Sequence, residues 1–378
     1  MSTSAQLTLR VGGMVYGGWK SVSVRTGIEQ IAGIFELAIT ERWPNQPTQW
    51  AIPPGESCAV EYGDEVLITG YVDAVAVNYD ASQHEIKVTG RDRTGDLVDC
   101  SAPSLAFSNL SLMQIAEKLC KPFGVTVIDE TTAAVRPGKP RAVKALPKQA
   151  VQNGETVHRA LEKLARIEGV LLASDGLGGL IITRAGLAGQ CDTVLEFGKN
   201  ILAASFEHSH AALYSEITVK GQASAAAAAQ YGVVDAQPKG VVKRSTLAST
   251  AGNSQINRYR PLIIVAETQA DGRRCQNRAA WEAGNREAKA RKVSVTVQGW
   301  RETADGPLWR INKRVRVVCP WMRLDEWWVI AAIDYKLDES GTTAELSLVS
   351  AGALDVLPEI PAVKSGAGDA AKYQVAKP

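Results

Sequence analysis

The first 100 residues contain short stretches in which apolar and polar positions alternate, with turn-forming residues between them. Val22 and Val24, for example, alternate with Ser21 and Ser23. The same period of two recurs at Phe35, Leu37 and Ile39, at Val75, Val77 and Tyr79, and at Ile86 and Val88. This alternation predicts strands with one buried face. Strands so short and evenly spaced predict that residues 1–100 form a small antiparallel β-barrel or sandwich, a first barrel domain.

Between residues 101 and 200 the apolar period becomes that of a helix. Ser111 and Gln114 have the spacing of a capping box. The residues after Ser111 place Leu112, Ile115, Ala116, Leu119 and Phe123 on one helical face, with Cys120 beside it. A second helix is predicted from Val157 to its stop at Gly169. Each helix leads into a strand, so residues 101–200 are predicted to be an α/β insert domain.

Strand alternation returns after residue 200, at Ile217 and Val219. A polar, Gly- and Ser-rich segment then extends to about Arg258 and is predicted to be a loop. An Ala-rich, charged stretch follows, in which Glu282–Arg286 and Glu287–Arg291 have the acid-first spacing of a surface helix. The predicted second β-barrel domain covers residues 201–352, with this loop and helix inserted at about 221–292. Residues 353–378 are predicted to be a flexible tail.

The last strands repeat the first ones. With an offset of 258 positions, residues 72–75 (VDAV) correspond to residues 330–333 (IAAI), and Asp80 corresponds to Asp338. A chance likeness between two antiparallel meanders is the alternative, because alternating strands share a pattern without shared ancestry. Two related small β-barrels are the simpler interpretation. The predicted fold class is therefore mainly β with an α/β insert.

Composition and charge limit the possible functions. The formal net charge of +2 is too small to indicate nucleic-acid binding through overall charge. No stretch approaches the roughly 18 apolar residues of a membrane span, and Met1–Arg10 lacks the features of a secretory signal. The six cysteines lie far apart without a C-x-x-C pair, which predicts reduced thiols in a cytosolic environment.

The sequence offers little material for catalysis. Its Gly-rich pieces match neither a phosphate-binding loop nor a dinucleotide fingerprint, and no G-x-S-x-G occurs. The pair His208 and His210 lacks a nearby third ligand, so we expect ordinary histidines, no metal and no cofactor. Asp92, Asp96 and Asp99 would share a face if helical, but interleaved arginines favour a structural turn. The sequence therefore predicts a structural protein with no catalytic residues.

A basic stripe with nearby tryptophans is the candidate site. Alternation over residues 310–317 places Arg310, Asn312, Arg314 and Arg316 on one predicted strand face. A solvated outer face is one interpretation, and a wall facing nucleic acid is another. The neighbours Trp327 and Trp328 must point to opposite faces of a strand, so at least one is expected outside the barrel core. The arginines Arg310, Arg314 and Arg316 and these two tryptophans are thus candidates for a subunit interface or channel lining.

The order of parts, together with several short motifs, resembles a known family. The motifs are Gly90-Arg91-Asp92, Leu97-Val98-Asp99-Cys100-Ser101, Ala280-Trp281, Gly299-Trp300, Leu308-Trp309 and Asn312. They resemble the baseplate hub proteins of contractile-tailed phages, those of Mu-like phages most closely, over essentially the whole chain. Relatives of that family occur in T-even phages and in the spike of bacterial type VI secretion.

This resemblance implies a homotrimeric ring in the tail baseplate of a virion, assembled in the host cytoplasm. Such a ring would join the sixfold tail tube and other baseplate proteins to a trimeric central spike, with DNA passing only in transit. Two like barrels per subunit would give a trimer six like surfaces, as that geometry requires. A tail-associated enzyme acting on cell-wall glycan, which would need two suitably spaced carboxylates, is one alternative function. A local nucleic-acid-binding module is the other.

Overall fold

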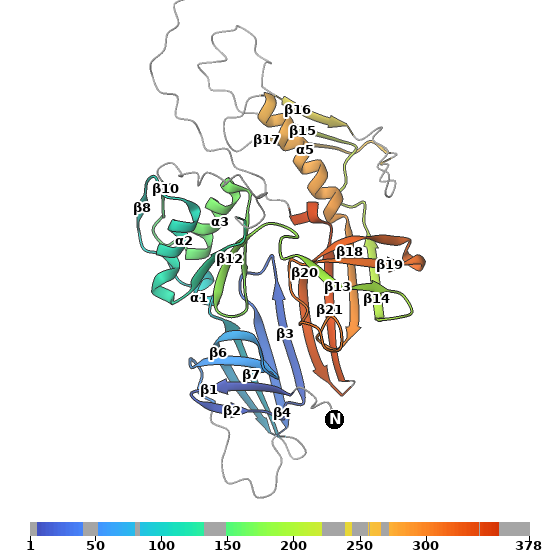
Figure 1. Ribbon diagram of the computed structural model, residues 1–378. Helices are drawn as coiled ribbons and strands as arrows, with labels where there is room; N and C mark the ends of the chain where they lie inside the picture. Colours follow the sequence, from blue (N-terminus) through green and yellow to red (C-terminus); the bar gives the residue numbers. More distant parts are fainter. Residues whose placement is uncertain are drawn as a thin grey trace, which may run out of the picture.

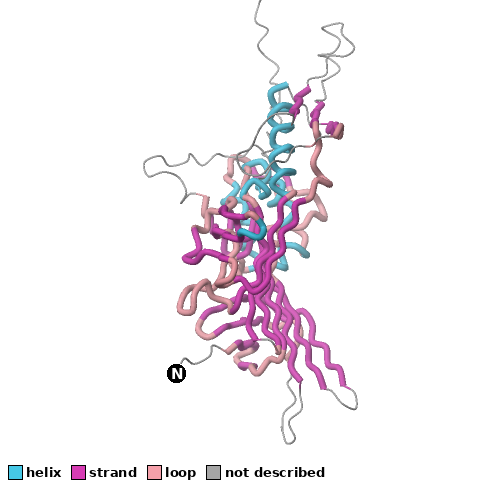
Figure 2. Tube along the Cα trace, turned by 90° about the vertical axis from the view of Figure 1, so that its right-hand side faces the viewer, coloured by secondary structure: helices cyan, strands magenta, loops and turns pink. Residues whose placement is uncertain are grey.

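The computed structural model describes residues 6–40, 52–79, 84–131, 149–220, 239–243, 256, 258–265, 272–339 and 341–354. Strands predominate, and the helices lie in two groups beside and above them (Figure 1). After a quarter turn the strands form an extended layer down the length of the molecule (Figure 2). The mainly β class expected from the sequence is confirmed. The run of five alanines at 225–229, within the loop predicted to extend to about Arg258, and most of the predicted tail, 355–378, lie outside the described residues.

The first half of the sheet is formed by the first seven strands. They are β1 (Leu7–Val11), β2 (Met14–Tyr16), β3 (Ser21–Gly27), β4 (Ile34–Thr40), β5 (Ser57–Tyr62), β6 (Glu65–Tyr79) and β7 (His84–Asp92). Alternate residues of β3 are buried, including Val22 and Val24. The periodicity of the sequence thus identified the inward face of β3 correctly.

The insert contains the next elements of the chain. These are α1 (Gly95–Asp99), β8 (Ala106–Phe107), α2 (Leu112–Cys120), η1 (Lys121–Phe123), β9 (Thr126–Asp129), β10 (Gln149–Ala150), α3 (Val157–Glu168), β11 (Leu171–Ser174) and β12 (Gly179–Thr183). The capping box is confirmed: the Gln114 amide donates to the Ser111 hydroxyl at 3.2 Å, and the Ser111 amide donates to Gln114 Oε1 at 3.0 Å. Leu119 is fully buried, and so is Cys120, which the helical stripe had left out.

The second half of the sheet is formed by strands that begin at Gln190 or later in the chain. They are β13 (Gln190–Glu196), β14 (Ile201–His208), β18 (Arg291–Gln298), β19 (Arg314–Cys319), β20 (Leu324–Asp338) and β21 (Gly341–Val349), with the short helices η2 (Pro320–Met322) and η3 (Ala351–Leu354). Above them stands a small layer made of β15 (Glu216–Lys220), β16 (Lys239–Lys243), β17 (Pro261–Val265) and α5 (Gly272–Lys289) (Figure 1). The predicted helix is therefore present. The predicted loop, however, contains the strand β16, which pairs with β15.

The two halves form one open sheet and not two closed barrels. The strand order is β14-β18-β21-β20-β3-β4-β7-β6-β5-β1-β2, with β19 beside β20 and β13 beside β19. The first half does not close on itself because β3 uses one edge for β4 and the other for β20. Figure 1 shows this junction where the blue β3 lies beside the red β20. The expectation of two separate barrels is thus corrected, for the described residues, to two halves of a continuous sheet.

The pairings reveal an internal repeat. In the first half, Val72 lies opposite Gly90, and the register shifts by one residue before Ala74. In the second half, Ile330 lies opposite Leu348, and the register shifts in the same way before Ala332. Both ends of both pairs differ by 258 positions, which is the offset between residues 72–75 and 330–333 in the sequence. A bulge is a specific local structure, so its recurrence at Asp73 and Ala331 indicates a true repeat.

One hydrophobic core extends through both halves. It includes Val24 and Phe35 from the first half and Trp300, Trp328 and Leu346 from the second. The insert has a core of its own, built around α2 and α3. Because buried apolar area is the main favourable term in folding, this shared core holds the two halves together as one unit.

Candidate functional site

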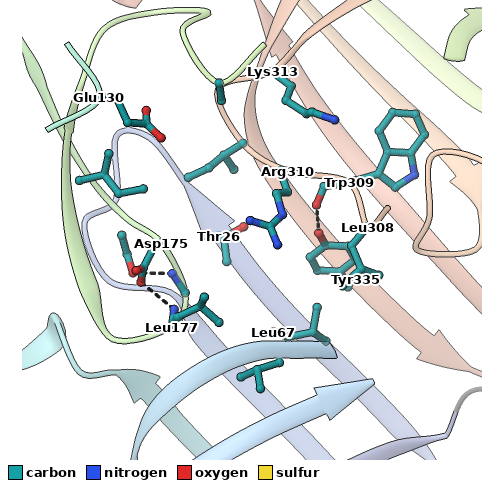
Figure 3. A pocket seen from close by; sticks show the side chains of 16 residues that line it. Thr26, Leu67, Glu130, Asp175, Leu177, Leu308, Trp309, Arg310, Lys313 and Tyr335 are labelled. Atoms are coloured by element: carbon teal, nitrogen blue, oxygen red, sulfur yellow. Dashed lines mark hydrogen bonds between the residues drawn. The ribbon is translucent and has the colours of Figure 1, made fainter. Parts of the chain in front are cut away.

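A cleft of about 240 Å³ lies where both halves and the insert meet. Thr26 of β3 and Leu67 of β6 line one side, residues 174–177 of the insert line another, and residues 308–311 and Lys313 before β19 complete it. Figure 3 shows these side chains converging on the cleft from separate parts of the chain. Clefts between domains are common binding sites. The side chains that line this cleft decide whether it can bind or transform a ligand.

The basic groups of the cleft have different surroundings. The exposed Arg310 extends into the space between Thr26 and Tyr335 (Figure 3). The Tyr335 hydroxyl donates to the carbonyl oxygen of Trp309, and burial raises the pKa of Tyr335 above its ordinary value. Lys313 forms an ion pair with the buried carboxylate of Glu302. Tyr335 and Lys313 therefore hold the wall of the cleft in place.

The carboxylates of the cleft are also held by structural hydrogen bonds. Glu130 Oε2 accepts from the Thr183 hydroxyl at 2.7 Å, which ties the end of β12 to the loop after β9. Asp175 Oδ1 accepts the amides of Leu177 and Gly179, each at 2.7 Å, and so closes the turn between β11 and β12. A pair of carboxylates acting on glycan needs an acid and a base free to reach substrate. Glu130 and Asp175 instead form hydrogen bonds that hold loops in place.

The Arg- and Asp-rich stretch that begins at the end of β7 has the structural role expected from the sequence. Arg91 bridges Asp73 on β6 and Asp99 on α1, with N–O distances of 2.7 and 2.8 Å. Asp92 is buried and accepts the amides of Gly33 and Thr94, each at 2.9 Å. Burial raises the pKa of Asp92, although these hydrogen bonds act in the opposite direction. The segment fastens the insert to the sheet.

The two histidines lie together at the end of β14. The rings of His208 and His210 are 5.0 Å apart, and burial is the main cause of a lowered pKa at His208. Among the described residues, no group of three His, Cys, Asp or Glu side chains has the arrangement of a metal site. All six cysteines have free thiols, and only Cys100 is exposed.

The predicted basic stripe is interrupted. The strand β19 begins at Arg314, so Arg310 and Asn312 precede it. Asn312 is buried with a φ of 66°, and its amide donates to the Thr183 hydroxyl and the Arg184 carbonyl, each at 2.9 Å. The expectation of four residues on one strand face was therefore wrong. Asn312 ties the second half to the insert instead.

Only some of the candidate interface residues remain on the surface. Arg314 and Arg316 are exposed on β19, and Arg316 pairs with Asp325. Trp327 lies opposite Arg316 across the β19–β20 ladder and is half exposed. Trp328 is buried in the shared core, where Arg291 lies over its ring. The prediction that the adjacent tryptophans face opposite ways is confirmed, and Trp328 offers no exposed anchor.

Sequence reasoning missed two strand edges. The second half of β6 pairs with β7 on one side, while β5 covers its other side only as far as Tyr71. β14 pairs with β18 alone and forms one end of the sheet order. No described strand pairs with either remaining edge. The repeat relates β6 to β20, whose same edge is covered by β3, but the pairing of β3 with β20 is visible only in the structure.

Comparisons with known proteins assign the chain to a family. Three domain families match separate parts of the chain. The N-terminal domain of Mu phage baseplate assembly protein GpP-like matches residues 6–92, and the second domain of baseplate hub protein gp44-like matches residues 94–184. The fourth domain of Mu phage baseplate assembly protein GpP matches residues 271–357. The chain is 36% identical to baseplate hub protein gp44 of Escherichia phage Mu over 316 residues, which is 83% of this chain and 79% of that protein. This chain belongs to the Mu-type baseplate hub family.

Solved structures agree with this family. The 43 kDa tail protein of prophage MuSo2 from Shewanella oneidensis is 35% identical, with a TM-score of 0.77 over 93% of this chain and 99% of that one. A tail protein from Neisseria meningitidis MC58 has the same fold, with 23% identity and a TM-score of 0.73 over 94% and 99% of the two chains. The hub protein is thus a phage tail component. None of its described helices is both long and apolar enough to span a membrane.

Proposed function

We propose that this hub protein is a structural adaptor that closes into a homotrimeric ring in the baseplate. The ring would connect a sixfold tail tube and neighbouring baseplate proteins above to a trimeric central spike below. Its opening would let DNA leave the virion, and the chain would catalyse no reaction. The observation on which this proposal mainly rests is the internal repeat, with its matching register and matching bulges.

Symmetry connects the repeat to the role. A closed ring of three identical chains has threefold symmetry, because cyclic assembly repeats one head-to-tail contact. Each chain contributes two halves that share the same strand register in β4–β7 and β18–β21. Three such chains present six similar surfaces around the axis. A ring of this kind can contact a sixfold tube on one face and a threefold spike on the other.

The chemistry of the cleft supports a role without catalysis. Its carboxylates close turns, and its tyrosine and lysine are engaged with neighbouring groups. The exposed Arg310, Arg314, Arg316 and Trp327 are proposed to lie at the subunit interface or along the channel, since arginine and tryptophan are common anchors of interfaces. Trp327→Ala and Arg314→Glu should then shift trimer towards monomer while the circular dichroism spectrum stays that of the parent.

The mass of the pure protein in solution tests the proposal. Sedimentation at micromolar concentration should give three times the chain mass of 40.4 kDa. End-on particle averages by electron microscopy should show six similar lobes around a central opening. A chain that stays monomeric at micromolar concentrations would contradict the adaptor role. A ring whose particle averages lack six similar lobes would also contradict it. Release of sugar from purified cell wall by the pure chain would favour the enzymatic alternative.

A further inference from the structure

The junction inside each chain provides a template for a second junction. In the chain itself, β20 pairs antiparallel with β3, with Tyr335 opposite Val24 and Asp334 opposite Arg25. Tyr335 and Val24 are both buried on the inner face of this junction. On the outer face, the Ser23 hydroxyl donates to Asp334 at 2.9 Å. The contact between the halves is therefore a continuous ladder with one apolar face and one polar face.

The repeat identifies the strands that correspond to this pair. The offset of 258 relates β20 to β6, so Tyr335 corresponds to Val77. The partner of β3 is found through its neighbour. Phe35 on β4 corresponds to Val293 on β18 by the same offset of 258. Phe35 lies opposite Val24 on β3, and Val293 lies opposite Phe206 on β14. The strand β14 therefore corresponds to β3, with Phe206 in the position of Val24. The expected second junction is thus β6 with β14.

Both corresponding edges carry apolar side chains that the folded chain leaves exposed or only partly buried. Val77 is 61% exposed, whereas Tyr335 at the same position of the repeat is 4% exposed. Phe206 is only partly buried, and β14 repeats the alternation of β3 with higher exposure at its inward positions. An unpaired, partly apolar edge is a template for pairing with another strand.

A second copy of this chain is the occupant that fits. β6 and β14 lie on opposite sides of the molecule (Figure 1), so they cannot pair within one chain. Each copy carries one edge of each kind, which gives a head-to-tail contact that can repeat around a ring. The β20–β3 ladder shows that the repeated framework accepts such a strand and in which direction.

We propose that β6 of one copy pairs antiparallel with β14 of the next, in the register of β20 and β3. Val77 then lies opposite Phe206 on the inner face, and Ala76 opposite Glu207 and Asn78 opposite Ser205 on the outer face. The sheet of each chain continues into the next, so the ring is closed by backbone hydrogen bonds as well as side chains. This inference rests on the proposed ring and specifies its interface.

Disulfide trapping tests the register. Cα atoms of directly opposite residues lie about 4.5–5.5 Å apart, which a disulfide can bridge. The test variant is Ala76→Cys with Glu207→Cys, two exposed positions, in a Cys100→Ser background that removes the exposed native thiol. The matched control is Ala76→Cys with Ser205→Cys. Its two residues share the same face but lie on the diagonal, at about 7–8 Å, where a disulfide does not form without backbone movement.

Assembly is first measured by sedimentation, and cross-links between chains after mild oxidation are then read on a non-reducing gel. We expect a trimer in which the Ala76/Glu207 variant cross-links about tenfold faster than the Ala76/Ser205 variant. A trimer in which neither pair cross-links, or both do so equally, would overturn the register while leaving the ring intact. Monomer throughout would overturn both the ring and this interface.

Discussion

The two halves of the sheet share a backbone pattern but differ in what covers it. β6–β7 and β20–β21 have the same register, and each has a one-residue bulge, at Asp73 and at Ala331. Tyr335 on β20 is buried under β3, while Val77 at the same place on β6 is exposed. The two strand pairs have the same backbone arrangement, so Val77 is more exposed than Tyr335 because β6 lacks a neighbouring strand in the position that β3 occupies beside β20. The comparison thus locates a surface that a single chain leaves incomplete.

The halves also fill the same space with different side chains. Phe35 lies opposite Gly90 in the first half, and Val293 lies opposite Leu348 at the matching positions of the second. A Cβ atom on Gly90 would overlap the Phe35 ring and the Tyr71 carbonyl oxygen. The first half therefore places one large side chain over a glycine, and the second half places two branched ones. Packing constrains the volume of the pair more tightly than the identity of either residue.

The largest expected effect separates the two equivalent positions Tyr335 and Val77. Tyr335→Ala removes a buried ring that packs 5.6 Å from Trp300, and should lower the free energy of unfolding by about 4 kcal/mol. Val77→Ala removes exposed methyl groups and should change the free energy of unfolding of the monomer by less than about 0.5 kcal/mol. Urea unfolding at a dilution where the chain is monomeric measures both. Equal losses would show that the edge of β6 is already covered within one chain.

Gly90→Ala should destabilise the protein by about 3 kcal/mol, because the added carbon forces β6 and β7 apart or displaces Phe35. The matched control is Gly284→Ala in α5, where a Cβ atom meets nothing within 4 Å. That change should stabilise the protein by about 0.5–1 kcal/mol through the lower flexibility of the unfolded chain. Urea denaturation midpoints with unchanged slopes check both values. If Gly90→Ala were as stable as the parent, the packing difference between the halves would have no energetic meaning.

Periodicity in the sequence identified most of the framework. Alternation predicted the strands around Val24 and Phe35, and a capping box predicted the start of α2 at Leu112. The repeat was visible as the offset of 258 because bulge and strand lengths are conserved between the halves. These features depend on residues close together in the chain, which is why the sequence alone contains them.

Features that depend on distant partners were not predictable in the same way. The alternation from Arg310 to Val317 suggested one strand, but the Asn312 amide bonds to groups near Thr183, and its backbone turns into the left-handed region. The open edge of β6 is defined only by the strand that covers the equivalent edge of β20. The prediction that each half closes into its own barrel was wrong, because no local sequence pattern shows that β3 pairs with β20.

The smallest expected effect concerns ion pairs that the two halves place differently. In the first half, Lys87 on β7 pairs with Glu36 on β4. In the second half, the position of Lys87 is occupied by Glu345, which pairs with Lys336 on β20 at 2.6 Å. The hydrogen bond from Lys336 is the main cause of a lowered pKa at Glu345. The charges have thus changed strands while the framework has stayed the same.

Glu345→Gln should lower the free energy of unfolding by about 0.5 kcal/mol at pH 7, because both partners are partly exposed and solvent screens the pair. A carboxyl group with a lowered pKa in the folded state stabilises the protein above its unfolded pKa and loses that contribution as the pH falls through its folded pKa. The difference between parent and variant in urea unfolding should therefore be constant from pH 6 to 8, shrink in the acidic range below the ordinary glutamate pKa of about 4.3, and weaken in about 1 M salt. Glu36→Gln is the matched control from the first half, where both side chains of the ion pair are also partly exposed. The contrary result would be a difference in the free energy of unfolding between parent and Glu345→Gln that grows as the pH falls. It would show that Lys336 does not stabilise the Glu345 carboxylate and that this ion pair does not contribute to stability.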